Sequence, residues 1–361
     1  IDELGARYDG VELVELALNC NLSNTMTHLC KIAPESLEKV IRAYLRKYDL
    51  MSLKRMLRWK KGGEKGRITD LLVPVGSYTM DELEELSNKS FEEILEEMAA
   101  LREEDADWED GRTWSLVYHI DREHEEFKNR AYALYSTQNA LSPSAFPSLV
   151  KFENEVVGMT ADWLGGDDAT VGNVTSGGTE SILLAVKTAR DWARAELGID
   201  RPHMVLPETA HPGFSKAGHY FDVEETRVET DDGWRADPDA IEAAITDETA
   251  LVVASTPSYP HGVVDPVREI AAIAADRGLM CHVDACIGGF VLASMRDAGY
   301  DVPPFDLSIE GVTSLSVDPH KYGYTAKGVS VLLWSEDAYR AHQFFSFDDW
   351  PGGVYAGPTL S

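Results

Sequence analysis

Long apolar runs, cysteines and basic residues are scarce in this sequence, and each scarcity excludes a class of protein. No run of about 18 apolar residues occurs, so we expect no membrane insertion. Residue 1 is Ile, and no signal-peptide or transit-peptide pattern follows it, so we expect a fragment of a cytoplasmic protein. The four cysteines form no CxxC pair and no zinc-like set, which favours reduced thiols and predicts no metal site.

Acidic side chains dominate the charge. The 361 residues contain 33 Lys and Arg against 62 Asp and Glu, and the net charge of −29 repels phosphates over most of the surface. This argues against a nucleic-acid partner. A hydrophobic content of 44% is enough for a real core, and the length predicts two domains or one large domain.

The charge also divides the chain into two regions. Residues 1–88 hold 13 basic and 14 acidic side chains, and residues 89–361 hold the other 20 and 48. The acidic excess of the second region is consistent with a high-salt source, where salt screens the repulsion between the acidic side chains. It is equally consistent with an ordinary acidic protein. The break near residue 88 indicates two segments of different origin.

The first region is predicted to be helical, because apolar residues recur at helical spacing without strand-like alternation. The clearest example is the basic stretch 39–61. Its apolar positions are Val40, Ile41, Tyr44, Leu45, Leu53, Met56 and Leu57. We expect helices with these residues inside and cations outside. The cationic face is either solvated or a surface for a membrane or an acidic partner.

From about Trp114 onward, short β-branched runs alternate with helical patterns, which predicts an α/β fold with a largely parallel sheet. The segment 175–181, Thr-Ser-Gly-Gly-Thr-Glu-Ser, lies between a strand pattern and a helix pattern. Its glycines let the backbone approach a ligand, and a helix N-terminus suits an anion. Gly177, Gly178 and Thr179 are therefore candidates for a phosphate site, although such a segment is often only a turn.

Three later segments place polar residues beside predicted strand ends. Asp284 ends an apolar strand, at the edge where open α/β sheets collect ligands. His211 starts a helix pattern, and His320 and Lys321 follow another strand-like run. Pyridoxal phosphate needs a lysine amine for a Schiff base, a carboxylate for its pyridine nitrogen, a phosphate cradle and a flat group over its ring. These residues supply all four, and a buried lysine is expected to lose its proton readily.

From about residue 91 to its end, the chain resembles the PLP-dependent group II decarboxylase family, within it the sphingosine phosphate lyase-like branch. The resemblance is carried by residues 175–185, 257–266, 282–290, 316–328 and 350–355. It implies a PLP fold type I large domain and a homodimer with active sites at the subunit interface. The implied roles are Lys321 as the Schiff-base lysine, Asp284 on the pyridine nitrogen, His211 on the ring, and Gly177, Gly178, Thr179 and His320 around the phosphate.

The sequence departs from this branch in two ways. Where the branch has Asn-Pro-Leu-His-Pro, residues 139–143 are Asn-Ala-Leu-Ser-Pro, so Ser142 replaces a histidine associated with the substrate phosphate. Lys327 matches the branch and remains a candidate for an anionic substrate group. The family's C-terminal small domain is missing from the sequence.

Residues 1–90 instead resemble the C subunit of archaeal-type rotary ATPases, an all-helical stalk protein. Residues 13–19, 46–58 and 70–76 carry this resemblance. It implies a structural role with rotary ATPase partners, a seam near residues 87–93 and a chimeric gene. The predicted domains are therefore residues 1–90 and 91–361.

The predicted activity is that of a PLP-dependent lyase that breaks a carbon–carbon bond next to an amine. Either an amino acid loses carbon dioxide, which would place the enzyme in carboxylic acid metabolism, or an amino alcohol phosphate is cleaved to an aldehyde. The alternative is a structural component of a rotary ATPase with an inert appendage. The sequence leaves the substrate open.

Overall fold

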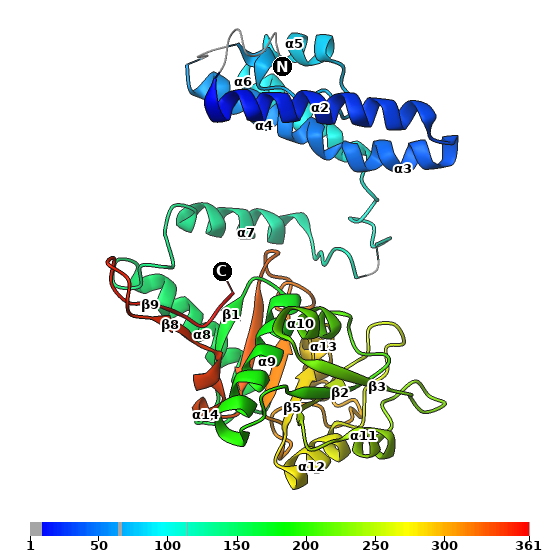
Figure 1. The fold of residues 1–361 in the computed structure, drawn as a ribbon, viewed down its shortest axis with the longest axis vertical. Coiled ribbons are helices and arrows are strands. Elements are labelled where there is room, and N and C mark those ends of the chain that lie inside the picture. Colours follow the sequence, from blue (N-terminus) through cyan, green and yellow to red (C-terminus); the bar gives the residue numbers. More distant parts are fainter. Residues whose placement is uncertain (1–8, 64–66, 114, 361) are drawn as a thin grey trace. The chain divides into compact units, whose positions relative to one another are not determined.

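The computed structural model describes residues 9–63, 67–113 and 115–360, and the chain divides into two compact units between Asp107 and Trp108 (Figure 1). Residues 91–107 belong to the first unit, where Ile94 is fully buried. The structural boundary thus lies beyond the seam predicted near residue 90. The assignment of residues 91–107 to the second gene segment stays a prediction from the sequence.

The regular elements of the first unit are all helices among its described residues, as the sequence predicts. Its α-helices are α2 (Gly10–Ile32), α3 (Glu35–Leu45), α4 (Lys47–Lys61), α5 (Met80–Ser87) and α6 (Phe91–Ala100), with short 3-10 turns η1 (Ile68–Asp70) and η2 (Leu101–Glu104). Capping boxes begin α5 and α6, because Thr79 and Ser90 each exchange hydrogen bonds with a Glu three residues later. Leu53, Met56 and Ile94 lie in its core.

The predicted burial of the basic stretch is correct for α4 and wrong for part of α3. Leu53 and Met56 are fully buried, whereas Val40 and Tyr44 are 63% and 64% exposed. α3 packs against α2 and α4 and buries Leu45 instead. Helical spacing identifies an apolar face, but it does not specify whether a neighbouring element covers that face.

The second unit contains a seven-stranded sheet in the order β1-β7-β6-β5-β4-β2-β3. The strands are β1 (Val171–Thr175), β2 (His203–Pro207), β3 (Glu224–Val228), β4 (Thr249–Ser255), β5 (Met280–Asp284), β6 (Ser314–Val317) and β7 (Ser330–Trp334). β7 runs antiparallel to its neighbours β1 and β6, and the other pairs are parallel. The predicted α/β fold with a largely parallel sheet is confirmed.

Helices cover both faces of this sheet (Figure 1). On one face lie α9 (Gly178–Trp192) and α10 (Gly213–Phe221), and on the other α8 (Pro147–Trp163), α11 (Pro238–Ala244), α12 (Val267–Arg277) and α13 (Gly289–Asp297). Because strand side chains alternate, Val252 faces one layer and Val253 the other. This arrangement leaves the carboxyl ends of the parallel strands open for ligands.

The remaining elements surround the sheet. They are α7 (Arg122–Tyr135), the π-helical turn η3 (Ala193–Leu197), α14 (Asp337–Arg340), η4 (Ala341–Gln343) and the two-stranded hairpin β8 (Phe345–Phe347) and β9 (Tyr355–Gly357). None of the helices that the structure describes has the length and apolar character needed to cross a membrane.

Candidate active site

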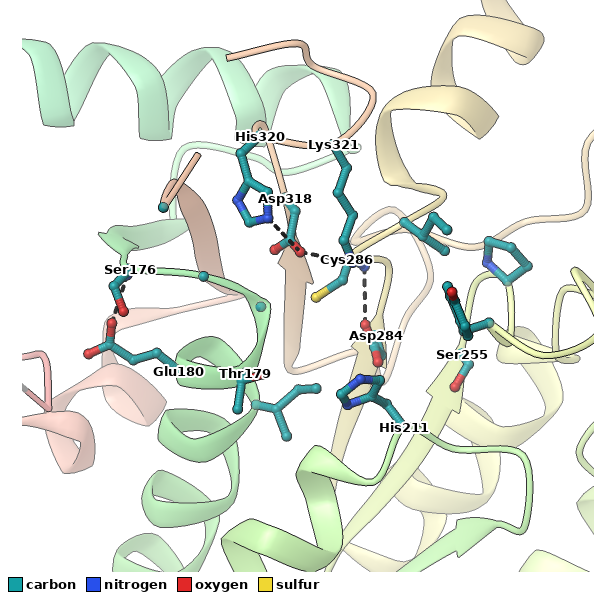
Figure 2. Close-up of a pocket in the computed structure, with 17 residues that line it drawn as sticks. Ser176, Thr179, Glu180, His211, Ser255, Asp284, Cys286, Asp318, His320 and Lys321 are labelled. Carbon is teal, nitrogen blue, oxygen red and sulfur yellow. Dashed lines mark hydrogen bonds and ion pairs between the residues drawn. The ribbon is translucent and has the colours of Figure 1, made fainter. Parts of the chain in front are cut away.

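A cavity of about 440 Å³ lies at the carboxyl ends of the parallel strands of the second unit. Side chains from the ends of several strands converge on it (Figure 2). It brings together all the residues predicted for the site, namely Gly177, Gly178, Thr179, His211, Asp284, His320 and Lys321. Residues separated by almost half of the sequence therefore share one space, because parallel strands end at the same edge of the sheet.

The turn between β1 and α9 forms the backbone wall of the cavity. Gly177 has φ +156°, which L side chains rarely adopt, and a Cβ on Gly178 would lie 2.7 Å from Asp318 Oδ2. Below the turn, Ser181 Oγ lies 2.7 Å from Thr175 Oγ1 and 2.8 Å from Ser330 Oγ, so buried hydroxyls fix the start of the helix. The turn thus presents backbone N–H groups of a 15-residue helix to the cavity, an arrangement that suits an anion.

Asp284 supplies a buried carboxylate at the end of β5. Its side chain is 9% exposed, and Oδ1 accepts a hydrogen bond from the Cys286 N–H at 3.1 Å. Two residues earlier on the same face, His282 lies between Ser314 Oγ and Ser316 Oγ at 2.8 and 3.1 Å. Burial lowers the pKa of His282 to about 4, so its imidazole is neutral at pH 7.

His211 lies between β2 and α10, and its ring lines the same cavity. Its Nδ1 accepts a hydrogen bond from the Gly213 N–H at 3.0 Å. Because a backbone N–H always donates, the neutral ring carries its proton on Nε2. The ring is thereby oriented by its own loop.

Lys321 is paired with Asp318, which is on the same loop after β6. Lys321 Nζ lies 3.0 Å from Asp318 Oδ2, and His320 Nε2 lies 3.8 Å from the same oxygen. Burial lowers the pKa of Lys321, but Cys286, Asp318 and Asp284 raise it, and the net pKa lies above its ordinary value. Since burial also raises the pKa of the Cys286 thiol and keeps it neutral, the two carboxylates hold the proton. The expectation that this lysine loses its proton readily is therefore wrong for the site as it stands.

Sequence reasoning missed Asp318, Cys286, Glu180 and Tyr259, which also line the cavity. Asp318 had a usable signal, because it precedes Lys321 by three residues and a turn brings such residues together. Glu180 had no such signal in the sequence. Its carboxylate accepts hydrogen bonds from the backbone N–H groups of Ser176 and of the distant Leu360.

The two residues considered for the substrate lie outside the set that lines the cavity. Ser142 is half-buried in a turn where its carbonyl accepts the Phe146 N–H. Lys327 Nζ donates to the Leu116 carbonyl at 3.2 Å and lies 5.0 Å from the ring centre of Tyr118. The structure thus gives Lys327 protein partners close to the lysine loop.

Residues 133–348 match the family described as the pyridoxal-dependent decarboxylase conserved domain. The chain belongs to this family. Its membership confirms the resemblance found in the sequence and indicates pyridoxal phosphate as the cofactor. Residues 1–136 match a second family, the ATP synthase (C/AC39) subunit.

Relatives of this pyridoxal-dependent chain carry a more specific name. The sphingosine-1-phosphate lyase of Dictyostelium discoideum is 44% identical over 271 residues, covering 74% of this chain and 51% of the relative. Sphingosine-1-phosphate lyase 1 of Mus musculus is 45% identical over 270 residues, covering 74% and 47%. The chain therefore spans about half the length of the curated relatives it matches.

Solved structures agree with this fold. The sphingosine-1-phosphate lyase of Burkholderia pseudomallei superposes with a TM-score of 0.73 at 41% identity, covering 76% of this chain and 65% of that one. A glutamate decarboxylase from Lactobacillus brevis superposes with a TM-score of 0.56 at 22% identity, which supports the fold alone. The likeness thus extends from sequence to structure.

Proposed function

We propose that this chain carries the cofactor-binding part of a PLP-dependent carbon–carbon lyase that acts on an amino compound. The meeting of Lys321, Asp284, His211 and the Gly177–Gly178 turn in one cavity carries the proposal. The cradle fits a phosphate, because the space that a Cβ on Gly177 would fill meets only His320 Cε1 within 4 Å, at 3.9 Å, and lies at the start of α9. When bound, pyridoxal phosphate supplies an electron-accepting ring beside the substrate amine.

Each residue has a distinct task in this proposal. The amine of Lys321 attaches the cofactor, and Asp284 keeps the pyridine nitrogen protonated from its fixed position at the end of β5. His211 lies over the ring, in the orientation that its Gly213 contact sets. Thr179, His320 and the two glycines hold the phosphate, assisted by the positive end of α9.

An amino alcohol phosphate is the substrate class that we propose first. The relatives named sphingosine-1-phosphate lyase support cleavage to an aldehyde over loss of carbon dioxide from an amino acid. Lys327 is a candidate for the anionic group of such a substrate, since it lies on the loop that follows Lys321. Ser142 replaces a histidine that the branch pattern associates with the substrate phosphate, so a weaker preference for the phosphorylated form of the substrate is expected.

The test of this function is a product assay with pyridoxal phosphate added to the 361-residue chain. Dihydrosphingosine phosphate is expected to release an aldehyde, and a panel of amino acids to release less carbon dioxide or none. Lys321→Ala is expected to reduce product to background, because no amine remains to attach the cofactor. Lys54→Ala, an exposed lysine in the first unit, is the control and should retain activity. No product on either substrate class, or full activity in Lys321→Ala, would overturn the proposal.

We also propose a homodimer, with α7 near the subunit contact. α7 has no buried residue and exposes Phe127 (59%), Tyr132 (71%) and Leu134 (72%). Large apolar side chains gathered on one helix are typical of a protein–protein interface. A second copy of this chain is the partner that the family resemblance implies.

For the first unit, we propose a structural role with rotary ATPase partners. The match of residues 1–136 to the ATP synthase (C/AC39) subunit supports this role. We retain residues 1–90 and 91–361 as the proposed segments of a chimeric gene. Pull-down by the first unit of rotary ATPase components, unaffected by Lys321→Ala, is the result that this role requires.

A further inference from the structure

Asp318 is a buried carboxylate that the proposed function does not use. Its side chain is 1% exposed, yet it lines the cavity. Oδ2 pairs with Lys321 Nζ at 3.0 Å, whereas Oδ1 has no hydrogen-bond partner among the described residues. A buried carboxylate with one unpaired oxygen is costly unless a cation or a hydrogen-bond donor compensates it.

The groups around Asp318 leave Lys321 as its main counter-charge. His320 lies on the same loop, with Nε2 at 3.8 Å from Oδ2. From the turn after β5, Cys286 and Asp284 face the Lys321 amine, and the thiol is neutral because burial raises its pKa. Tyr118, whose pKa burial raises to about 12, is neutral at pH 7, and the more distant Lys327 completes the set.

We propose that Asp318 controls cofactor loading: it holds Lys321 as an ammonium in the empty site and accepts its proton when the amine attaches pyridoxal phosphate. This inference rests on the proposed function. An ammonium has no lone pair, so the proton must leave before the nitrogen can form a bond. The proton passes from Nζ to the adjacent Oδ2, the nitrogen bonds to the aldehyde carbon of the cofactor, and the carbonyl oxygen leaves as water with the two hydrogens that remain on the nitrogen.

Proton transfer to Asp318 also removes an electrostatic conflict. The start of α9 lies beside Asp318, since a Cβ on Gly178 would be 2.7 Å from Oδ2 and 3.0 Å from Oδ1. While the amine is deprotonated, a phosphate bound at this helix end would face the carboxylate without the cation that balanced it. A protonated Asp318 is neutral and can donate a hydrogen bond instead.

The first test measures the Lys321 proton directly, without the cofactor. Trace acetylation of the apoprotein between pH 7 and 12, followed by peptide mass spectrometry, gives the pH at which each lysine becomes reactive. In the wild type, Lys321 is expected to react at a pH at least about one unit above the exposed Lys54. Asp318→Asn should lower the Lys321 midpoint by at least about one unit, which is a tenfold change in free amine. Asp306→Asn, which breaks the ion pair between the buried Asp306 and the partly exposed Arg296 away from the cavity, should leave it unchanged.

The second test follows attachment of added pyridoxal phosphate by absorbance across the same pH range. In Asp318→Asn and in the second variant Asp318→Ser, the pH profile of the attachment rate should move to lower pH. Relief of repulsion between Asp318 and the phosphate would instead raise the rate by the same factor at every pH. A Lys321 midpoint at or below that of Lys54 in the wild type would overturn the proposal, even if both variants fail to fold. So would unshifted attachment profiles in folded variants. If pyridoxal phosphate never attaches while the Lys321 titration behaves as expected, the proposed function and the loading step both fail, and only the pairing of Asp318 with the Lys321 ammonium stands.

Discussion

The two units of the chain treat their buried polar groups differently. In the helical unit, Asp49, Ser52 and Ser87 are buried and hydrogen-bonded to backbone groups, and among its described residues Thr69 Oγ1 is the one buried polar side-chain atom without a partner. In the α/β unit, buried polar atoms gather at the strand ends, and several there have no partner among the described residues. These atoms are Ser255 Oγ, Thr256 Oγ1, Ser258 Oγ, Thr209 Oγ1 and Asp318 Oδ1. Of these residues, Ser255 and Asp318 line the cavity, so their unpaired oxygens are available to a group bound there.

The largest expected effect comes from filling the cavity wall. Gly178→Ala places a Cβ 2.7 Å from Asp318 Oδ2 and 2.8 Å from Cys286 Sγ, so the phosphate cradle must shift. We expect pyridoxal phosphate affinity to fall at least about a hundredfold, as loss of well-placed anion contacts implies. Titration by absorbance measures it.

Gly158→Ala is the matched control for this change. Gly158 lies in α8, and a Cβ there meets nothing within 4 Å. The control should stabilise the α/β unit by about 0.5–1 kcal/mol and leave cofactor affinity unchanged. Equal affinity in Gly178→Ala and Gly158→Ala would show that the turn between β1 and α9 does not hold the phosphate.

The contrast between the two units also shows which features could be predicted from the sequence alone. The α/β sheet was predictable, because buried β-branched runs and helical patterns alternate along the chain. The residues of the site were predictable because each follows a strand, and parallel strands end at one edge. The protonation state of Lys321 was not predictable from the sequence. Burial lowers its pKa and a neighbouring carboxylate raises it, and only the 3.0 Å contact with Asp318 decides which effect is larger.

The exposure of the apolar residues of α3 could not be predicted from the sequence either. Val40 and Tyr44 occupy the apolar positions of a regular helical pattern, yet both are largely exposed. A periodic pattern reports which residues share a face, and burial depends on what packs against that face. The resemblance to known families provided the roles of Asp284 and His211, which no spacing argument could assign.

A second prediction separates the stability of the two units. Leu53 is fully buried in the core of the helical unit, so Leu53→Ala should destabilise that unit by about 2–5 kcal/mol. Cofactor affinity should not change, because the cavity is lined by residues between 176 and 328. Hydrogen exchange resolved by peptide, together with the absorbance titration, measures both effects.

Leu37→Ala is the control for Leu53→Ala, because Leu37 is 50% exposed on α3 of the same unit. Its effect on stability should stay within about 0.5 kcal/mol. If Leu53→Ala weakened cofactor binding as strongly as Gly178→Ala, the two units could not be treated as independent, and the structural role proposed for the first unit would need revision.

The smallest effect concerns acid stability. His282 is fully buried, and burial lowers its pKa to about 4 from an ordinary value of 6.5, whereas the single histidine of the helical unit, His28, is exposed. A lowered pKa means that the unfolded state binds the proton more readily, so this contribution is complete above pH 6.5 and is lost as the pH falls towards 4. The loss amounts to about 3 kcal/mol at most.

Burial raises the pKa of Asp265 to about 6, so its carboxyl takes up a proton in the folded state over the same pH range and offsets part of this loss. His282→Gln isolates the histidine contribution. Denaturant unfolding at pH 7.5 and pH 4.5 should show a smaller decrease in His282→Gln than in the wild type, and the exposed His219→Gln should behave like the wild type. Parallel decreases in all three proteins would mean that another group governs acid unfolding. A decrease confined to the α/β unit would show that its buried polar groups, and not those of the helical unit, make its stability depend on pH.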